Sequence, residues 1–379
     1  MNLFKESVEY NLSFLLPTLG IHPVSGAAFS LARYKIKLSF FVELNRLLLN
    51  FHQRNSVKLW KGFQLLAGDG STVSLPPSRQ IKQYFGVYSE KGGKIKSCMA
   101  RVFALYDVYS NIILSSAMSG MEVSEKVMLK NCIGELEGNK QLIILDRGFG
   151  YFNICNELIR QKKAFCIRLS TAQSFFAKAA LANPLNDFIT QWVPSEAEKK
   201  TCSELGNDCG SIKVRVSKIR LNTGEIELLV SSLFDLEAIK LTDMAELYGF
   251  RWGIEEAFKK LKPKMKLEQF GSRKPDGIFQ EFQAHIFMMN LISLMGEQAQ
   301  IEITKKYSTR KLTYKYNWQN AFRTIRRQII QIIGLDNSEK VFDKIIESIK
   351  ASIIPIKPGR SFKRIVYKRR KNRLHQTYK

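Results

Sequence analysis

Four polar residues follow one another at helical spacing in the second half of the sequence. Tyr248, Arg251, Glu255 and Lys262 are separated by three, four and seven residues. On an α-helix with about 100° between successive residues, their side chains fall within an arc of about 60°. A neighbouring apolar stripe can anchor this helix to a core. The spacing predicts one continuous helix that presents a carboxylate among two cations and a phenol, an arrangement able to hold a metal-binding glutamate beside a phosphate backbone.

Two aspartates upstream stand in settings that suit the same chemistry. Asp146 follows the apolar run 141–145, which reads as a buried strand. Asp69 stands between Gly68 and Gly70, directly after a second apolar run. We expect both aspartates at strand ends, where open α/β sheets place ligands. Taken alone, a Gly-Asp-Gly is also typical of a turn, and an Asp-Arg-Gly after a strand is typical of a helix N-cap.

The helical string resembles a known motif. Residues 248–262 carry the pattern Tyr-x2-Arg-x3-Glu-x6-Lys, including an Arg-Trp-x-Ile-Glu core. This pattern resembles the signature of the insertion-sequence-four family of DDE transposases. Residues 270–285 also resemble the segment that follows the motif in that family. The resemblance covers roughly residues 60–300.

The resemblance implies two groups of site residues. The implied catalytic residues, which would also be the metal ligands, are Asp69, Asp146 and Glu255. The implied DNA-binding residues are Tyr248, Arg251 and Lys262. Glu256 is a rival for the third acid, but on the predicted helix it lies about 100° away from Glu255. Glu255 is therefore preferred.

Three converging carboxylates repel one another, so a cleft that gathers them needs cations. Mg²⁺ prefers hard oxygen ligands and completes its shell with waters and substrate phosphates. A pair of such ions about 3.5–4 Å apart supports in-line displacement at phosphorus. The resemblance therefore implies Mg²⁺ as the cofactor, and we expect Mn²⁺ to substitute for it.

The charge of the chain favours a polyanionic partner. The sequence has 59 Lys and Arg against 34 Asp and Glu, a net charge of +25 and a pI near 9.8. Residues 357–379 hold ten basic residues and no acidic one, and such a run is also typical of a disordered end. Charge alone leaves DNA, RNA and acidic membranes open. The resemblance implies double-stranded DNA, namely inverted-repeat ends and target DNA, with a homodimer on the DNA because paired ends are cut.

The order of apolar runs indicates an α/β protein. It resembles an RNase H-like catalytic core with a β-rich insertion and flanking helical regions. A strand hairpin is expected at 213–232 from its alternating pattern around Asn222–Gly224. The expected regions are helices at 1–58, the first part of the core at 59–170, the insertion at 171–235, the helix with Glu255 and its successor at 236–300, and a helical region with the basic tail at 301–379.

The remaining features concern location. No cleavable signal is evident, and the apolar run 284–295 is too short to span a bilayer. The six cysteines form no C-x2-C pair, which favours buried thiols in a reducing compartment. We expect a cytoplasmic, nucleoid-associated protein without a membrane partner.

The resulting prediction is a transposase that cuts and joins the ends of its own insertion sequence. Two alternatives stay open, a general nuclease on the same fold and a basic DNA-binding protein or inactive transposase remnant. One departure concerns the pathway. Some relatives stack a flipped base on a tryptophan of the insertion, yet no tryptophan lies between Trp192 and Trp252.

Overall fold

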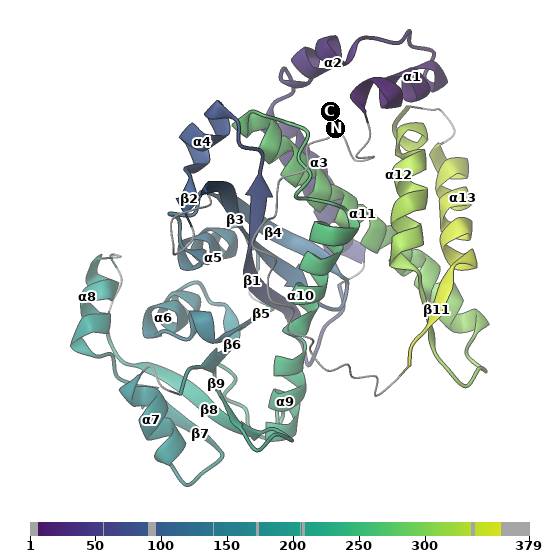
Figure 1. Ribbon diagram of the computed structural model, residues 1–379. Coiled ribbons are helices and arrows are strands. Elements are labelled where there is room, and N and C mark those ends of the chain that lie inside the picture. The colour runs from purple at the N-terminus through teal and green to yellow at the C-terminus, as the bar shows by residue number, and fades with distance from the viewer. Residues whose placement is uncertain are drawn as a thin grey trace. The chain divides into compact units, whose positions relative to one another are not determined.

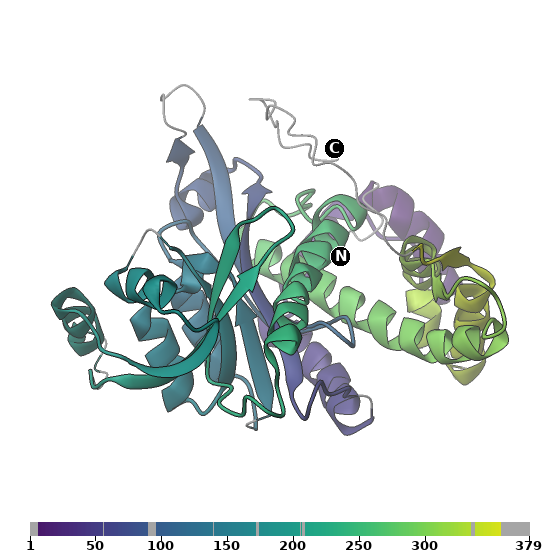
Figure 2. The same cartoon turned by 90° about the horizontal axis from the view of Figure 1, so that it is seen from below.

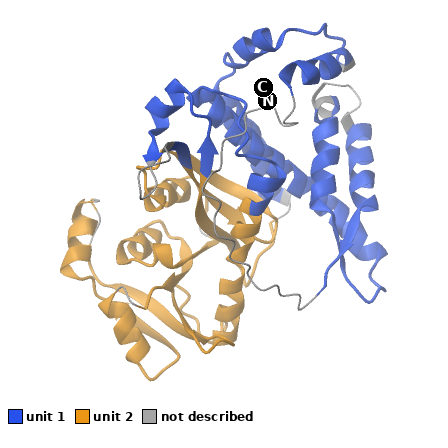
Figure 3. Ribbon diagram, in the orientation of Figure 1, with its two compact units in different colours: residues 1–56, 73–100, 259–379 blue, residues 57–72, 101–258 orange. Residues whose placement is uncertain are grey.

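The computed structural model describes residues 7–55, 57–89, 96–138, 140–171, 174–204, 206, 209–334 and 338–357. The basic tail predicted from the sequence lies outside these residues from position 358 onwards. The chain divides into two compact units, coloured separately in Figure 3. Unit 1 comprises Met1–Ser56, Val73–Ala100 and Lys259–Lys379, and unit 2 comprises Val57–Thr72 and Arg101–Phe258. The five regions expected from the sequence stay a prediction.

One sheet of nine strands is formed by the described residues (Figure 1). Its order is β2-β3-β1-β5-β6-β9-β8-β7, and β4 pairs with β3. The strands are β1 Gln64–Leu75, β2 Tyr88–Ser89, β3 Lys96–Asp107, β4 Ile112–Ser119, β5 Gln141–Leu145, β6 Ala164–Leu169, β7 Asp187–Trp192, β8 Ile212–Arg220 and β9 Ile226–Ser231.

The centre of the sheet is parallel. In β1 and β5, Ala67 pairs with Ile144, and in β5 and β6, Leu145 pairs with Ile167. All five residues of β5 are buried, as expected for a central strand covered on both faces. The strand order β4-β3-β1-β5-β6, with its antiparallel β3–β4 pair, confirms the predicted α/β class with an RNase H-like core.

The predicted hairpin in the insertion is confirmed as β8 and β9. β9 also pairs antiparallel with β6, so the inserted strands extend the core sheet. Arg215 on β8 is fully buried and its Nε donates to Asp187 Oδ1 on β7 at 2.8 Å. A shifted register would leave this guanidinium buried without its carboxylate, which is costly. The pair therefore fixes the register of the outer strands.

Helices cover both faces of the sheet within unit 2. On one face α5 and α6 pack against a core that includes Leu66, Ile143 and Leu145. On the other face α9 packs against a core that includes Leu65 and Ile144. Figure 2 shows the teal helices of unit 2 beside its strands. The helices of this unit are α5 Glu125–Gly134, α6 Phe152–Arg160, α7 Phe175–Ala182, α8 Glu196–Glu204, α9 Leu241–Gly249 and α10 Trp252–Lys259, the last of which ends at the first residue of unit 1.

Unit 1 is mainly helical. Its long helix α11, Pro275–Lys306, packs against α3, where Asn290 Nδ2 donates to Asn45 Oδ1 at 3.0 Å. Its other elements are α1 Val8–Thr18, α2 Gly26–Arg33, α3 Leu38–Asn55, α4 Arg79–Phe85, α12 Trp318–Gly334, α13 Ser338–Ala351 and the two-stranded antiparallel sheet of β10 Tyr314–Tyr316 with β11 Ile353–Pro355. None of the described helices combines the length and apolarity needed to cross a bilayer.

The helical region expected at 1–58 is interrupted between α2 and α3. The chain leaves the helix after Arg33 and begins α3 at Leu38. Arg33 forms an ion pair of 3.1 Å with Glu281, which is 1% exposed, and Tyr34 shares a hydrogen bond with Ser272. These long-range polar contacts hold the turn between the two helices, so tertiary contacts override the local helical pattern.

Candidate active site

Asp69 lies inside a strand. The predicted strand end was wrong, because β1 continues from Gln64 to Leu75 through Gly68 and Gly70. Neither glycine has a positive φ, so both keep an extended backbone. A Cβ at Gly68 would lie 2.6 Å from Leu145 Cδ2, which shows that this glycine allows close packing. The predicted turn is thus a strand in which glycine provides space.

Asp146 follows β5 directly, as predicted. Its Oδ1 accepts a hydrogen bond of 2.8 Å from Gly148 N and so caps the short 3-10 helix Arg147–Phe149. The paired stretch of β1 and β5 ends at Ala67 and Ile144, and each aspartate stands two positions beyond it. Both aspartates therefore lie at the same end of the parallel ladder, the carboxyl end, where α/β sheets place ligand sites.

Burial and neighbouring charges change the pKa of the Asp69 carboxyl group. Burial raises its pKa to about 6, against the opposing hydrogen bond from Gly70 N. The charge of Asp146 raises the pKa further, the charge of Arg251 lowers it, and that of Glu125 raises it slightly. Burial therefore disfavours the negative charge of Asp69, and a divalent cation nearby would stabilise it.

This raised pKa has a measurable consequence. An acid with a raised folded-state pKa contributes stability below its ordinary pKa of 3.8, and this contribution is lost as pH rises through about 6. In metal-free buffer, Asp69→Asn should therefore raise the free energy of unfolding by about 1–3 kcal/mol at pH 7.5 and by much less at pH 4.5. Urea unfolding at both pH values measures the difference, with the exposed Asp343→Asn as control. An equal change in the free energy of unfolding at both pH values would contradict the raised pKa of Asp69.

The polar motif does not lie on one helix. The predicted continuous helix was wrong, since α9 ends at Gly249 and α10 begins at Trp252. In the intervening turn, Arg251 N donates to Tyr248 O at 3.1 Å and Gly253 N donates to Phe250 O at 3.0 Å. Hydrogen bonds between residues three apart tighten the chain and change the rotation per residue. The regular α-helical rotation of about 100° per residue therefore does not apply across the turn.

Arg251 and Glu255 nevertheless meet. The Nη2 atom of Arg251 donates to Glu255 Oε1 at 2.9 Å, and Arg251 is 8% exposed. Burial opposes its charge, yet the bond to Glu255 makes the net pKa of Arg251 higher than usual. The guanidinium carbon lies 5.9 Å from the ring centre of Tyr248 and 4.7 Å from that of Trp252. Arg251 is thus fixed by a carboxylate and two aromatic rings.

Tyr248 is part of the core. It is 6% exposed and packs with Leu247 and Met244 beneath the sheet. Burial raises the pKa of its phenol, and the nearby charges of Arg251 and Arg168 only partly oppose this. The phenol therefore stays protonated and can donate a hydrogen bond.

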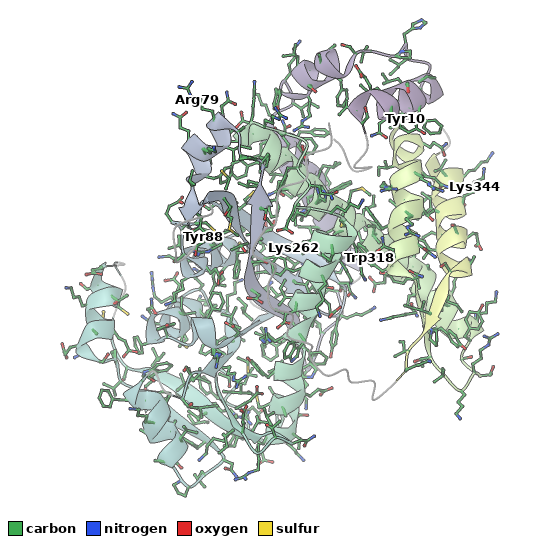
Figure 4. All side chains as sticks on the ribbon, in the orientation of Figure 1. Tyr10, Arg79, Tyr88, Lys262, Trp318 and Lys344 are labelled. Carbon is green, nitrogen blue, oxygen red and sulfur yellow. The ribbon has the colours of Figure 1, made fainter. Side chains whose placement is uncertain are left out.

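Lys262 belongs to unit 1, whereas the other five predicted residues belong to unit 2. It lies on the π-helical turn Lys260–Lys264 that continues the chain after α10, and Figure 4 labels it. Its Nζ is 3.8 Å from Glu268 Oε1. Glu268 also accepts a hydrogen bond of 3.2 Å from Ser74 N in the same unit, so Lys262 is held beside the end of β1.

The three predicted metal ligands are only partly assembled. Among the residues that the structure describes, no group of three or more His, Cys, Asp or Glu is arranged to hold a metal ion. The aspartates lie beyond the same end of the paired stretch of β1 and β5, while Glu255 is paired with Arg251. The donor set still suits a hard cation, because carboxylate oxygens are the ligands that Mg²⁺ prefers and Asp69 lacks sufficient positive charge around it.

Two charged residues not selected from the sequence lie close to these groups. Arg168 stands on β6 one position beyond the pair Leu145–Ile167, and its Nη1 is 2.7 Å from Glu227 Oε1. Glu125 opens α5 and lies against Gly70. A charge inside an otherwise apolar strand was a readable signal for Arg168. Glu125 gave no such signal, because the residue that it contacts is distant in sequence.

Comparison with known proteins identifies the family of the chain. Residues 60–291 match the family described as Transposase DDE domain. The Transposase InsG for insertion sequence element IS4 of Escherichia coli (strain K12) is 22% identical over 237 residues, which cover 62% of this chain and 52% of that protein. The chain thus spans about half the length of this curated relative. A solved piggyBac transposase synaptic complex with hairpin DNA has a TM-score of 0.43 at 10% identity, covering 76% of this chain and 57% of the other. Since the family match includes more than half of its residues, the chain belongs to the family of transposase DDE domains.

Proposed function

We propose that the chain is the DNA transposase of a bacterial-type insertion sequence. It would bind the terminal inverted repeats and cleave a DNA strand with water. The freed 3′-OH would then attack a phosphodiester of the target DNA, joining the strand and displacing a 3′-OH of the target. The observation that carries this proposal is the placement of Asp69 and Asp146 beyond the same end of the parallel pair β1 and β5, in a chain of the transposase DDE family.

The proposed cofactor is Mg²⁺, with Mn²⁺ as a substitute. Asp69, Asp146 and Glu255 would hold it. Once bound, divalent ions would stabilise negative charge on the attacked phosphate and on the attacking and leaving oxygens. Glu255 would have to exchange its bond with Arg251 for the metal, and Arg251 would then be available to the substrate.

The remaining residues of the motif would position the DNA. The guanidinium of Arg251 is suited to forked recognition of a phosphate, and its aromatic neighbours limit its motion. The protonated phenol of Tyr248 would donate to a phosphate oxygen. Lys262 would supply a compact positive charge further along the backbone.

The proposed partner is double-stranded DNA, both the inverted-repeat ends and the target. The net charge of +25 supports a polyanionic partner and predicts salt-sensitive binding. Cutting two ends together calls for a homodimer on the DNA. Because the proposed substrate is chromosomal or plasmid DNA, we place the activity at the nucleoid in the cytoplasm.

A donor plasmid that carries the coding region with its native flanking DNA tests the proposal. With Mg²⁺ and a target plasmid, we expect strand breaks at the ends of the element and covalent joining of the freed 3′ ends to the target. Breaks without joining would favour a general nuclease. Binding without breaks would favour a DNA-binding protein or an inactive remnant.

Lys262→Ala should weaken engagement of the DNA ends more than metal binding. Loss of one phosphate contact is expected to lower DNA affinity by roughly three- to tenfold and to reduce the salt slope of binding by about one. Fluorescence anisotropy at several salt concentrations measures both quantities. Lys344→Ala removes the same charge from the exposed surface of α13 and is the matched control. A Lys262 variant that changed only metal affinity would contradict the phosphate role.

A further inference from the structure

The strand that carries Asp69 passes the start of α5 at very close range. A Cβ built on Gly70 would lie 2.7 Å from Glu125 Cγ, and it would lie even closer to the carboxylate of Glu125. Gly70 has no positive φ, so its backbone does not require glycine. A side chain at this position would displace the carboxylate of Glu125, which is the flexible end of that residue.

Gly70 is also the residue that fixes Asp69. Its backbone N donates to Asp69 Oδ1 at 2.8 Å. Successive residues of a strand point to opposite faces, so the open side of Gly70 faces α5 while the side chain of Asp69 points to the other face. Glu125 therefore contacts the strand from behind Asp69.

Several contacts hold Glu125 in place. It is the first residue of α5, where Ser124 Oγ accepts a hydrogen bond from Val127 N. Arg101 Nη1 donates to Val123 O at 2.5 Å, and Arg101 Nε lies 3.7 Å from Glu125 Oε1. A carboxylate is also favoured at the positive end of a helix. The charge is thus held by a neighbouring strand and by its own helix.

We propose that Glu125 is a positioning residue of the candidate active site. Its carboxylate packs on Gly70, restrains the Asp69–Gly70 segment of β1 and adds a fourth negative charge to the field in which the divalent metal binds. Glu125 would act through Asp69, without contact with the metal or the DNA. This inference rests on the proposed function and deepens it.

The role predicts a defined effect on metal binding. Glu125→Gln keeps the size of the side chain and removes its charge, so the Mg²⁺ concentration for half-maximal cleavage should rise by about three- to tenfold. The rate at saturating Mg²⁺ should stay within about twofold, because no group that contacts the DNA changes. The dissociation constant for Mn²⁺ on the full chain, measured by electron paramagnetic resonance without DNA, should rise by the same factor.

Glu122→Gln is the matched control, because Glu122 is exposed, lies three residues before Glu125 and loses the same charge. Gly70→Ala supplies a second route to the same effect, since the new methyl group must displace the Glu125 carboxylate. The double variant Gly70→Ala with Glu125→Gln should bind Mn²⁺ no more weakly than the weaker of the two single variants. Such non-additivity indicates that both changes act on one contact.

The outcomes separate this inference from the proposed function. If Glu125→Gln and Glu122→Gln bind Mn²⁺ alike, or if Gly70→Ala and Glu125→Gln act additively, the positioning role is wrong. If wild-type protein binds no Mn²⁺, or if Asp69→Asn binds Mn²⁺ as tightly as wild type, the proposed metal centre itself is wrong. A weaker Mn²⁺ site in Glu125→Gln, with an unchanged site in Glu122→Gln, supports the inference.

Discussion

Asp146→Asn should reduce Mg²⁺-dependent strand cleavage by a factor on the order of 10³ or more, and Asp69→Asn and Glu255→Gln should do the same. Each change removes a negative oxygen from the proposed metal site and leaves the size of the side chain almost unchanged. DNA affinity should stay within about threefold, because none of these acids is proposed to bind a phosphate. Single-turnover cleavage of a labelled element end, together with a binding titration, measures both quantities.

Glu256→Gln is the control for this series. Glu256 is exposed and adjacent to Glu255 on α10, so it reports the effect of removing a nearby charge that is not a proposed ligand. Its cleavage rate should stay within about twofold of wild type. Cleavage at the wild-type rate in any of the three acid variants would remove that residue from the proposed centre.

Arg251→Ala should have the second largest effect. It removes the partner of Glu255 from a partly buried pair, which should lower the free energy of unfolding by about 1–3 kcal/mol. It also removes the forked donor proposed for a phosphate, so cleavage should fall by a factor on the order of 10². Urea unfolding measures the first effect and single-turnover cleavage the second.

Arg251→Lys separates the two roles of this residue. Lysine keeps the positive charge but lacks the planar fork, so stability should recover more fully than cleavage. Lys259→Ala, an exposed change on the same helix, is the control for charge alone. Full recovery of cleavage in Arg251→Lys would show that a point charge is sufficient there.

Much of the central fold was predictable from local pattern. The run 141–145 is β5 at its predicted bounds, and the similar apolar run 164–169 is β6. Both strands are short apolar runs flanked by polar residues, which is the pattern of a strand buried on both faces. The pairing of β9 with β6 was not predictable, because nothing local in either strand specifies a partner more than fifty residues away.

The failures at the candidate site have physical reasons. Gly68 and Gly70 indicated a turn, but their role is steric, since side chains of Leu145 and Glu125 fill the space beside them. The helix through residue 262 breaks first at the tight turn around Phe250. It then widens into a π-helical turn at Pro263, a residue that lacks the N–H needed for the α-helical bond. Pro263 was a visible warning against one continuous helix.

The residue types of the site were easier to predict than their geometry. The motif spacing placed Arg251 and Glu255 on one helical face, and the structure pairs them within a single helical turn. Glu125 was not identified, because its contact with Gly70 depends on how α5 packs on the sheet. Local spacing therefore predicted contacts within an element, whereas contacts between elements required the structure.

A change of metal preference tests most directly whether Asp69, Asp146 and Glu255 share one metal centre. Replacing each in turn with cysteine supplies a softer ligand that suits Mn²⁺ better than Mg²⁺. We predict that Asp146→Cys shows no cleavage in Mg²⁺ and recovers measurable cleavage in Mn²⁺, with the same behaviour at the other two positions, whereas Asp146→Asn recovers none. Full activity of a cysteine variant in Mg²⁺, or no recovery in Mn²⁺ at any of the three positions, would contradict the shared centre.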